Sequence, residues 1–118
     1  MLTTPLAEYF RFYNRLKKPE EYGAVFSSKN RSNDKFFLFL AIKNSINIAR
    51  LGLAVPKKNV SSAVERNRIK RIIRESFRSQ KNELKGRDVV VFVKKQFGTK
   101  KGDIKQTLIS HWDKIINE

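Results

Sequence analysis

Residues 63–78 form a helical pattern with one apolar face and one basic face, and this pattern limits what the chain can fold into. Apolar side chains recur at helical spacing, at Ile69, Ile72, Ile73 and Phe77. Ser62 and Glu65 have the Ser-x-x-Glu spacing of a capping box, so the helix is expected to begin near Ala63. An amphipathic helix of this kind buries its apolar side in a core. The segment therefore predicts a folded body with a sheet against which this helix packs.

The other side of this helix carries basic residues that repel one another. Four basic residues lie at successive i+4 positions: Arg66, Lys70, Arg74 and Arg78. Asn67 and Arg71 lie beside this row, and Arg68 lies on a separate edge of the helix. Each like-charged i,i+4 pair destabilises an isolated helix by about 0.2–0.5 kcal/mol. Guanidinium groups bind phosphate oxygens in a bidentate manner and stack on bases. We therefore expect this face to bind nucleic acid rather than water alone.

The whole chain is also strongly basic. Its 118 residues include 26 Lys and Arg against 11 Asp and Glu, which gives a net charge of +15. This charge favours a polyanionic partner, with nucleic acid as the first candidate and an anionic membrane surface as the second. The sequence contains no cysteine, no apolar run of membrane-spanning length and no signal-peptide pattern. A soluble, cytoplasmic protein outside the membrane is therefore expected.

The rest of the chain predicts one α/β domain over residues 14–118, preceded by an extension over residues 1–13 that we expect to be partly disordered. The expected elements are strands at 36–42, 48–55 and 88–94, helices at 19–27 and 103–116, and a polar turn at 29–34. Alternation within the first strand places Phe39 on the face opposite Leu38 and Leu40.

The residues favour RNA over DNA and a binding role over catalysis. The chain lacks the three-helix pattern of a helix-turn-helix protein, zinc ligands and zipper heptads, whereas a strand-rich body with a basic helix suits RNA. The one histidine, His111, falls on a predicted core helix, and the acidic residues are scattered along the chain. Neither feature suits a two-metal nuclease. We therefore predict no catalytic residue and no metal ligand on this chain.

The segment from Ala63 to Glu75, AVERNRIKRIIRE, resembles the signature A-x-x-R-N-R-x-K-R-x-x-R-E of the bacterial ribonuclease P protein family. Four further segments are similar to this family: LGLAVPKKNV, NRLKKPEEYGAVF, DVVVFVKK and the tryptophan-containing last helix. The resemblance covers residues 14–116. It implies an α/β (α+β) two-layer sandwich in which a small mixed sheet packs with about three helices. It also implies a left-handed β-α-β crossover around the basic helix.

The resemblance implies a function as well. The ribonuclease P holoenzyme removes the 5′ leader of precursor tRNA, while its large RNA subunit and Mg²⁺ ions carry the chemistry. The expected partners are the ribonuclease P RNA, in a one-to-one complex, and precursor tRNA, with Mg²⁺ bound mainly by the RNA. The alternative is a structural RNA-binding protein of ribosomal type, which would have no cleft for a substrate.

In this family the single-stranded leader lies in a cleft between the sheet and the N-terminal helix, and several residues are candidates to line it here. Tyr22 and Phe26 lie four residues apart on one predicted helix face, and Phe39 is predicted on the sheet. Stacking of a base on such a ring contributes about 1–3 kcal/mol whatever the base. The basic candidates are Arg15, Lys57 and Lys58. The alternative, that the three aromatic residues pack in the core, stays open.

Overall fold

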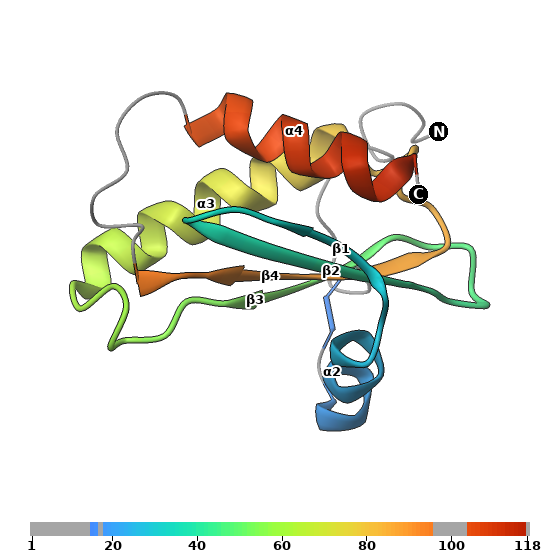
Figure 1. Ribbon diagram of the computed structural model, residues 1–118, viewed down its shortest axis with the longest axis horizontal. Helices are drawn as coiled ribbons and strands as arrows, with labels where there is room; N and C mark the ends of the chain where they lie inside the picture. The colour runs from blue at the N-terminus through green and yellow to red at the C-terminus, as the bar shows by residue number, and fades with distance from the viewer. Residues whose placement is uncertain (1–14, 17, 96–103, 118) are drawn as a thin grey trace, which may run out of the picture.

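Four strands form one mixed sheet in the computed structural model, which describes residues 15–16, 18–95 and 104–117 (Figure 1). In chain order the elements are α2 (Pro19–Phe26), β1 (Asn30–Asn33), β2 (Phe37–Lys43), β3 (Arg50–Ala54), α3 (Ala63–Ser79), β4 (Arg87–Val93) and α4 (Ile104–Ile116). The extension predicted over residues 1–13 lies outside the described residues.

The strands lie in the order β1-β2-β4-β3, so the last strand along the chain occupies an interior position. β2 pairs antiparallel with both β1 and β4, and Leu40 lies opposite Val90. β3 runs parallel to β4, with Leu51 opposite Val89. Because two parallel neighbours need a crossover connection, α3 joins them and completes a β-α-β unit. The left-handed sense of this crossover stays a prediction.

Helices cover both faces of the sheet, with α3 and α4 on one face and the short α2 on the other (Figure 1). The larger core contains side chains from the sheet, α3 and α4, including Phe37, Phe39, Val89, Val91, Ile69, Ile73, Phe77, Leu108, Trp112 and Ile115. A smaller core under α2 contains Leu16, Val25, Leu40 and Val90. The apolar arc predicted for the basic helix is therefore confirmed, with Ile72 half-buried at its edge.

The start of α3 has the Ser62 half of the predicted capping box, while the Glu65 carboxylate binds Arg68. The Ser62 hydroxyl accepts a hydrogen bond from the Glu65 backbone N–H at 3.2 Å, and the helix begins at Ala63. The Glu65 carboxylate binds the Arg68 guanidinium, and this contact lowers the pKa of Glu65. At α2, Pro19 occupies the start of the helix, as predicted from its fixed φ angle.

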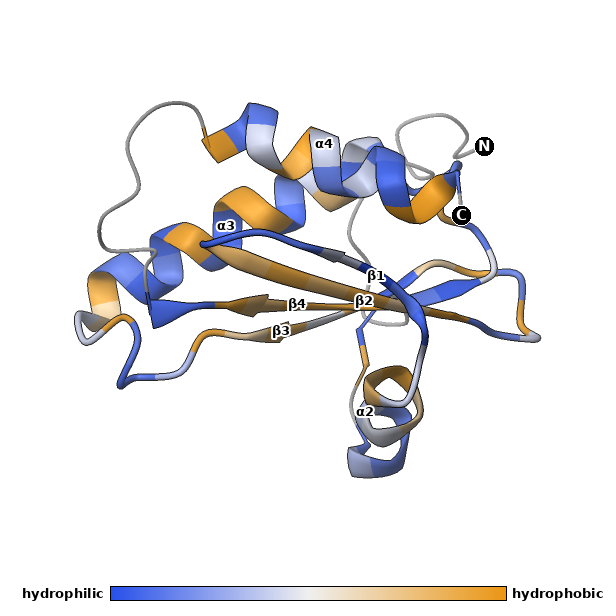
Figure 2. Ribbon diagram, viewed as in Figure 1, coloured by the Kyte–Doolittle hydropathy of each residue, from blue (hydrophilic) through white to orange (hydrophobic). Residues whose placement is uncertain are grey.

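The polar turn predicted at residues 29–34 was wrong, because most of this segment is the edge strand β1. Figure 2 shows β2 and β4 as largely hydrophobic and β1 as largely hydrophilic. An edge strand exposes most of its side chains to water, so β1 carries no apolar pattern. Ser32 is the buried member of this strand. The turn follows β1 and begins at Asp34, whose carboxylate accepts hydrogen bonds from the backbone N–H groups of Phe36 (2.7 Å) and Phe37 (2.8 Å).

Candidate nucleic-acid interface

The basic side of α3 faces away from the core, because the opposite side is buried against the sheet. Its exposed members are Asn67, Arg68, Arg71 and Arg78, and its half-buried members are Arg66, Lys70 and Arg74. The first group is fully accessible to a large partner, whereas the side chains of the second group are partly covered by the rest of the protein. We call the set Asn67, Arg71, Arg74 and Arg78 the basic face of α3.

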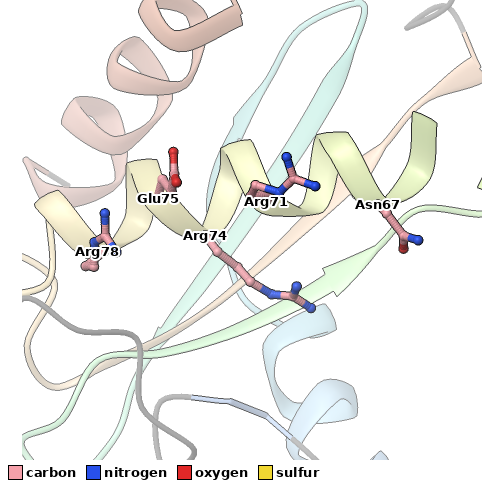
Figure 3. A pocket seen from close by; sticks show the side chains of 5 residues that line it. All are labelled: Asn67, Arg71, Arg74, Glu75 and Arg78. Carbon is pink, nitrogen blue, oxygen red and sulfur yellow. The ribbon is translucent and has the colours of Figure 1, made fainter. Parts of the chain in front are cut away.

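A hollow of about 390 Å³ runs along this basic face, lined by Asn67, Arg71, Arg74, Glu75 and Arg78 (Figure 3). Three guanidinium groups and one amide supply hydrogen-bond donors there, against a single carboxylate. In Figure 3 the Arg74 side chain extends from the helix toward β3 and α2. The hollow is therefore suited to an anion with several acceptor oxygens, such as the phosphates of a nucleic acid.

A second hollow, of about 180 Å³, lies where α2, β3 and α3 meet. Its lining residues are Arg15, Leu16, Tyr22, Leu51, Leu53, Lys70 and Arg74. An aromatic ring and three leucines supply an apolar wall, and three basic side chains supply positive charge. Arg74 lines both hollows, so the two form one continuous basic surface. We call the second one the α2–β3 hollow.

The charge of Arg74 is disfavoured by its surroundings. Partial burial and, to a smaller extent, the positive charge of Arg15 lower the pKa of Arg74 below its ordinary value. Arginine nevertheless stays protonated in proteins at neutral pH, so the repulsion between these two cations persists in the folded chain. A phosphate group bound between them would relieve this repulsion.

Tyr22 occupies the place predicted for it, at the wall of the α2–β3 hollow. Its hydroxyl donates a hydrogen bond to the backbone carbonyl of Leu16 at 3.3 Å, and its ring packs against the smaller core. Phe26 lies one turn further along α2 and is 47% exposed. Tyr22 is thus half-buried and fixed, whereas Phe26 presents its ring to solvent.

The prediction that Phe39 shares this cleft was wrong. Phe39 is fully buried on the other face of the sheet, where its ring stacks on His111 with centroids 4.5 Å apart and lies edge-on to Trp112 at 4.7 Å. Successive side chains of a strand alternate between faces, and Leu40 already occupies the face toward α2. Phe39 therefore belongs to the core beneath α4.

Of the remaining predicted basic residues, Arg15 lines the hollow, whereas Lys57 and Lys58 are not among its lining residues. Arg15 forms an isolated parallel bridge with Leu51 of β3, which brings its side chain to the hollow. Lys57 and Lys58 are exposed in the loop that connects β3 to α3. This loop leads directly into the N-terminus of the basic helix, so the two lysines extend the positive surface beyond the β3 strand.

Comparison with known proteins decides the family of this chain. A profile of the ribonuclease P family matches residues 10–116. The chain belongs to the ribonuclease P family. It is 49% identical over 81 residues to the ribonuclease P protein component of Aliivibrio fischeri, a match that covers 69% of each chain. It is 46% identical over 80 residues to that of Nitrosococcus oceani, covering 68% of this chain and 67% of the relative.

Solved structures of ribonuclease P proteins have the same fold. The Staphylococcus aureus protein superposes with a TM-score of 0.71 at 25% identity, over 88% of this chain and 93% of that one. The Thermotoga maritima protein gives a TM-score of 0.67 at 30% identity, over 87% and 92% of the two chains. The predicted mixed sheet with three helices is therefore confirmed as the ribonuclease P protein fold.

Two residues of this ribonuclease P family member organise the site in ways that the sequence pattern did not indicate. Arg66 uses its guanidinium to hold the loop before α3, donating to the carbonyls of Val60 (3.0 Å) and Ser61 (2.8 Å). Arg50 joins Glu21 of α2 to Asp88 of β4, each at 2.7 Å. These partners are 29 and 38 residues from Arg50 along the sequence, so only the tertiary fold reveals them.

His111 lies in the core, on the helix that was predicted to pack there. Its ring is buried between the Ser32 hydroxyl at 2.6 Å from Nδ1 and the Asp34 carboxylate at 2.9 Å from Nε2. Among the described residues, no three His, Cys, Asp or Glu side chains lie together as a metal site would require. None of the helices in the described part of the chain is long and apolar enough to cross a membrane.

Proposed function

We propose that this chain is the protein subunit of ribonuclease P. In this proposal the basic face of α3 binds the catalytic RNA, and the α2–β3 hollow holds the single-stranded 5′ leader of precursor tRNA. The complex supports endonucleolytic removal of the leader in the cytoplasm, with one protein bound to one RNA. The observation that carries the proposal is the continuous basic surface that joins an arginine-lined hollow to an aromatic one at Arg74, in a chain of this family.

The chemistry of both hollows supports binding over catalysis. Arg71, Arg74 and Arg78 supply planar donor groups that match phosphate oxygens. Tyr22 supplies a ring that can stack on any base, which suits a leader of variable sequence. In this proposal the protein binds and orients two RNA molecules relative to each other, and the RNA subunit carries the reaction.

Mg²⁺ is the metal that the family implies, and the residues of the basic face do not fit it. Mg²⁺ prefers an octahedral set of oxygen ligands. The first hollow offers one carboxylate, Glu75, among three guanidinium groups, and these groups repel a divalent cation. We therefore propose that Mg²⁺ is bound mainly by the RNA subunit, and we derive no catalytic step on this chain.

Reconstitution tests the function directly. The chain is mixed with bacterial ribonuclease P RNA and a precursor tRNA at low Mg²⁺, and the rate of leader removal is compared with that of the RNA alone. We expect faster cleavage with the protein, because its positive charge replaces part of the screening that Mg²⁺ otherwise supplies. Protein without RNA is expected to leave the substrate intact.

Two outcomes of this experiment would contradict the proposal. Equal rates with and without the protein, despite measurable RNA binding, would favour a structural RNA-binding protein of ribosomal type. Cleavage by the protein alone, persisting after further purification, would favour a stand-alone nuclease.

A further inference from the structure

Gly52 of β3 leaves space that the Tyr22 ring occupies. A Cβ atom placed on Gly52 would lie 2.6 Å from Cε1, 2.8 Å from Cζ and 2.9 Å from the hydroxyl oxygen of Tyr22. Real Cβ atoms essentially never approach another heavy atom this closely. The ring therefore lies directly on the backbone of β3, in the position that any other residue would fill with its side chain.

Further contacts hold the Tyr22 ring on this strand. Its hydroxyl donates to the Leu16 carbonyl, and the ring packs against the smaller core. The preceding residue, Glu21, pairs with Arg50 at 2.7 Å, so α2 is fastened to the sheet next to the ring. These contacts restrict the ring on the strand side and leave part of it accessible from the α2–β3 hollow.

Basic side chains surround the accessible part of the ring. Lys70 and Arg74 of α3 and Arg15 line the same hollow, which extends from Tyr22 across to α3. A nucleotide needs both an aromatic surface for its base and positive charge for its phosphate. The hollow provides the two side by side, and the position of the ring decides whether a base fits against it.

We propose that Gly52 is a positioning residue for substrate recognition. Its missing side chain lets the Tyr22 ring lie against β3, where the ring stacks on one unpaired base of the leader while the neighbouring phosphate contacts Lys70 and Arg74. This inference rests on the proposed function of the α2–β3 hollow. Gly52 itself acts through Tyr22, because a side chain at this position pushes the ring away from the strand and into the space of the base.

The test compares two alanine substitutions on glycines of the holoenzyme. Gly52→Ala introduces the clash with Tyr22, whereas Gly23→Ala, on α2, places a Cβ with no atom within 4 Å and serves as the control. Affinity is measured for precursor tRNA with its leader and for mature tRNA without it. We expect Gly52→Ala to weaken binding of the precursor by about 5- to 150-fold. This factor corresponds to a stacking free energy of about 1–3 kcal/mol for one base.

The same experiment defines the outcomes that would overturn the inference. Mature tRNA is expected to bind both variants as it binds the wild type, and Gly23→Ala is expected to leave precursor affinity unchanged. Equal losses for precursor and mature tRNA would mean that Gly52 serves the fold alone. Unchanged precursor affinity in Gly52→Ala, with a wild type that prefers precursor, would overturn the inference and leave the proposed function standing. A wild type that does not distinguish the two RNAs would instead overturn the proposed function.

A double variant separates positioning from folding. Tyr22→Leu removes the three atoms that a Cβ on Gly52 would meet most closely, so Gly52→Ala is expected to fold in that background. If Gly52 acts through the ring, adding Gly52→Ala to Tyr22→Leu changes precursor affinity by less than about twofold. A further loss of about fivefold or more in the double variant, relative to Tyr22→Leu, would contradict a role through Tyr22. This arm decides the question even if Gly52→Ala alone proves too unstable to assay.

Discussion

At the scale of single residues, arginines on one helix have different roles. Arg66 and Arg78 lie on the same basic stripe of the helix wheel, yet Arg66 turns back to hold two backbone carbonyls and Arg78 lines the exposed hollow. A buried or half-buried donor that satisfies carbonyl oxygens contributes to folding, whereas an exposed guanidinium contributes little to stability and is available to a partner. The two functions can therefore be separated by substitution.

Arg66→Ala is expected to reduce the free energy of unfolding by about 1–2 kcal/mol, because two hydrogen bonds from a charged group are lost. Arg78→Ala is expected to leave it within about 0.5 kcal/mol of the wild type. For binding to the catalytic RNA, Arg78→Ala should lower the slope of log affinity against log salt by about 0.7–0.9, the loss of one phosphate contact. Lys114→Ala, an exposed lysine near the end of α4, is the charge-matched control.

Urea denaturation and salt-dependent binding measure the two effects independently. An Arg66→Ala variant with wild-type stability would show that the carbonyl contacts contribute nothing. An unchanged slope in Arg78→Ala would show that this side chain does not contact a phosphate.

At this scale the sequence predicts a residue well when its role depends on local pattern. The arginines of the basic face follow from helical spacing, and the place of Tyr22 in a cleft follows from the family resemblance; each lines a hollow in the structure. The positions of Phe39 and Gly52 depend on which sheet face α2 covers, and a single sequence does not contain that information. The alternation of the strand correctly put Phe39 and Leu40 on different faces of the sheet. Phe39 would have been excluded from the cleft if the face covered by α2 had been known.

At the scale of elements, the edge strand β1 is fastened to α4 through the buried His111 ring and through a hydrogen bond from the Asn30 side chain to the Ile115 carbonyl at 3.3 Å. His111 of α4 binds Ser32 within β1 and Asp34 just after it, and Lys94 reaches the same turn at the Asp34 carbonyl at 2.6 Å. With Nε2 protonated, the neutral ring donates to Asp34 and accepts from the Ser32 hydroxyl. Protonation of Nδ1 would remove this acceptor, so the hydrogen bond between Ser32 of β1 and His111 of α4 depends on a neutral ring.

The stability of the chain is therefore expected to fall in mild acid. Burial lowers the pKa of His111 below its ordinary 6.5, although Asp34 acts in the opposite direction, and the charges of Lys114 and Lys94 lower it further. Below about pH 6.5 the unfolded chain takes up a proton that the folded chain does not, so the free energy of unfolding falls by up to about 1.4 kcal/mol per pH unit. Urea denaturation at about pH 7.5 and 5.5 measures the change.

The chain has one histidine, so substitution provides a clean control. His111→Gln removes the titrating group, and its stability should vary less between these two pH values than that of the wild type. Equal or greater wild-type stability at the lower pH would contradict the expected direction. Asp34, whose pKa is lowered by its backbone hydrogen bonds and His111 against the opposing effect of burial, titrates below this range.

Elements with an apolar pattern were predicted to within two residues of their observed ends, because burial determines both the pattern and the strand. β2, β3 and β4 are runs of this kind, and α3 and α4 have apolar arcs. β1 was missed because an edge strand is held by backbone pairing with β2 rather than by its side chains. Its inward residues, Asn30 and Ser32, are polar and bind the Ile115 carbonyl and the His111 ring of α4, which no local pattern indicates.

At the scale of the whole molecule, the net charge of +15 opposes compaction. We expect the melting temperature to rise by about 3–6 °C, equivalent to about 1 kcal/mol, when salt increases from about 0.01 M to 0.15 M. The Debye length falls from about 30 Å to about 8 Å over this range, which screens repulsion between distant surface charges. Thermal unfolding followed by circular dichroism measures the effect.

A variant with two fewer positive charges, Arg71→Gln with Arg78→Gln, should show a smaller rise in melting temperature over the same salt range. Both side chains are exposed on the basic face, so the substitution changes charge and leaves the core intact. A melting temperature that falls with salt would show that attractive ion pairs, such as those of Arg50, outweigh the repulsion.

The interior position of β4 has a consequence for how the chain acquires its fold during synthesis. β2 and β3 flank β4 on either side, so neither strand has its inner neighbour until residues 87–93 have left the ribosome. The β2–β4 pairing closes a long segment of chain, which is slow compared with local hairpin formation. Until then two apolar strand edges are open at once, in a nascent chain whose own positive charges keep neighbouring copies apart.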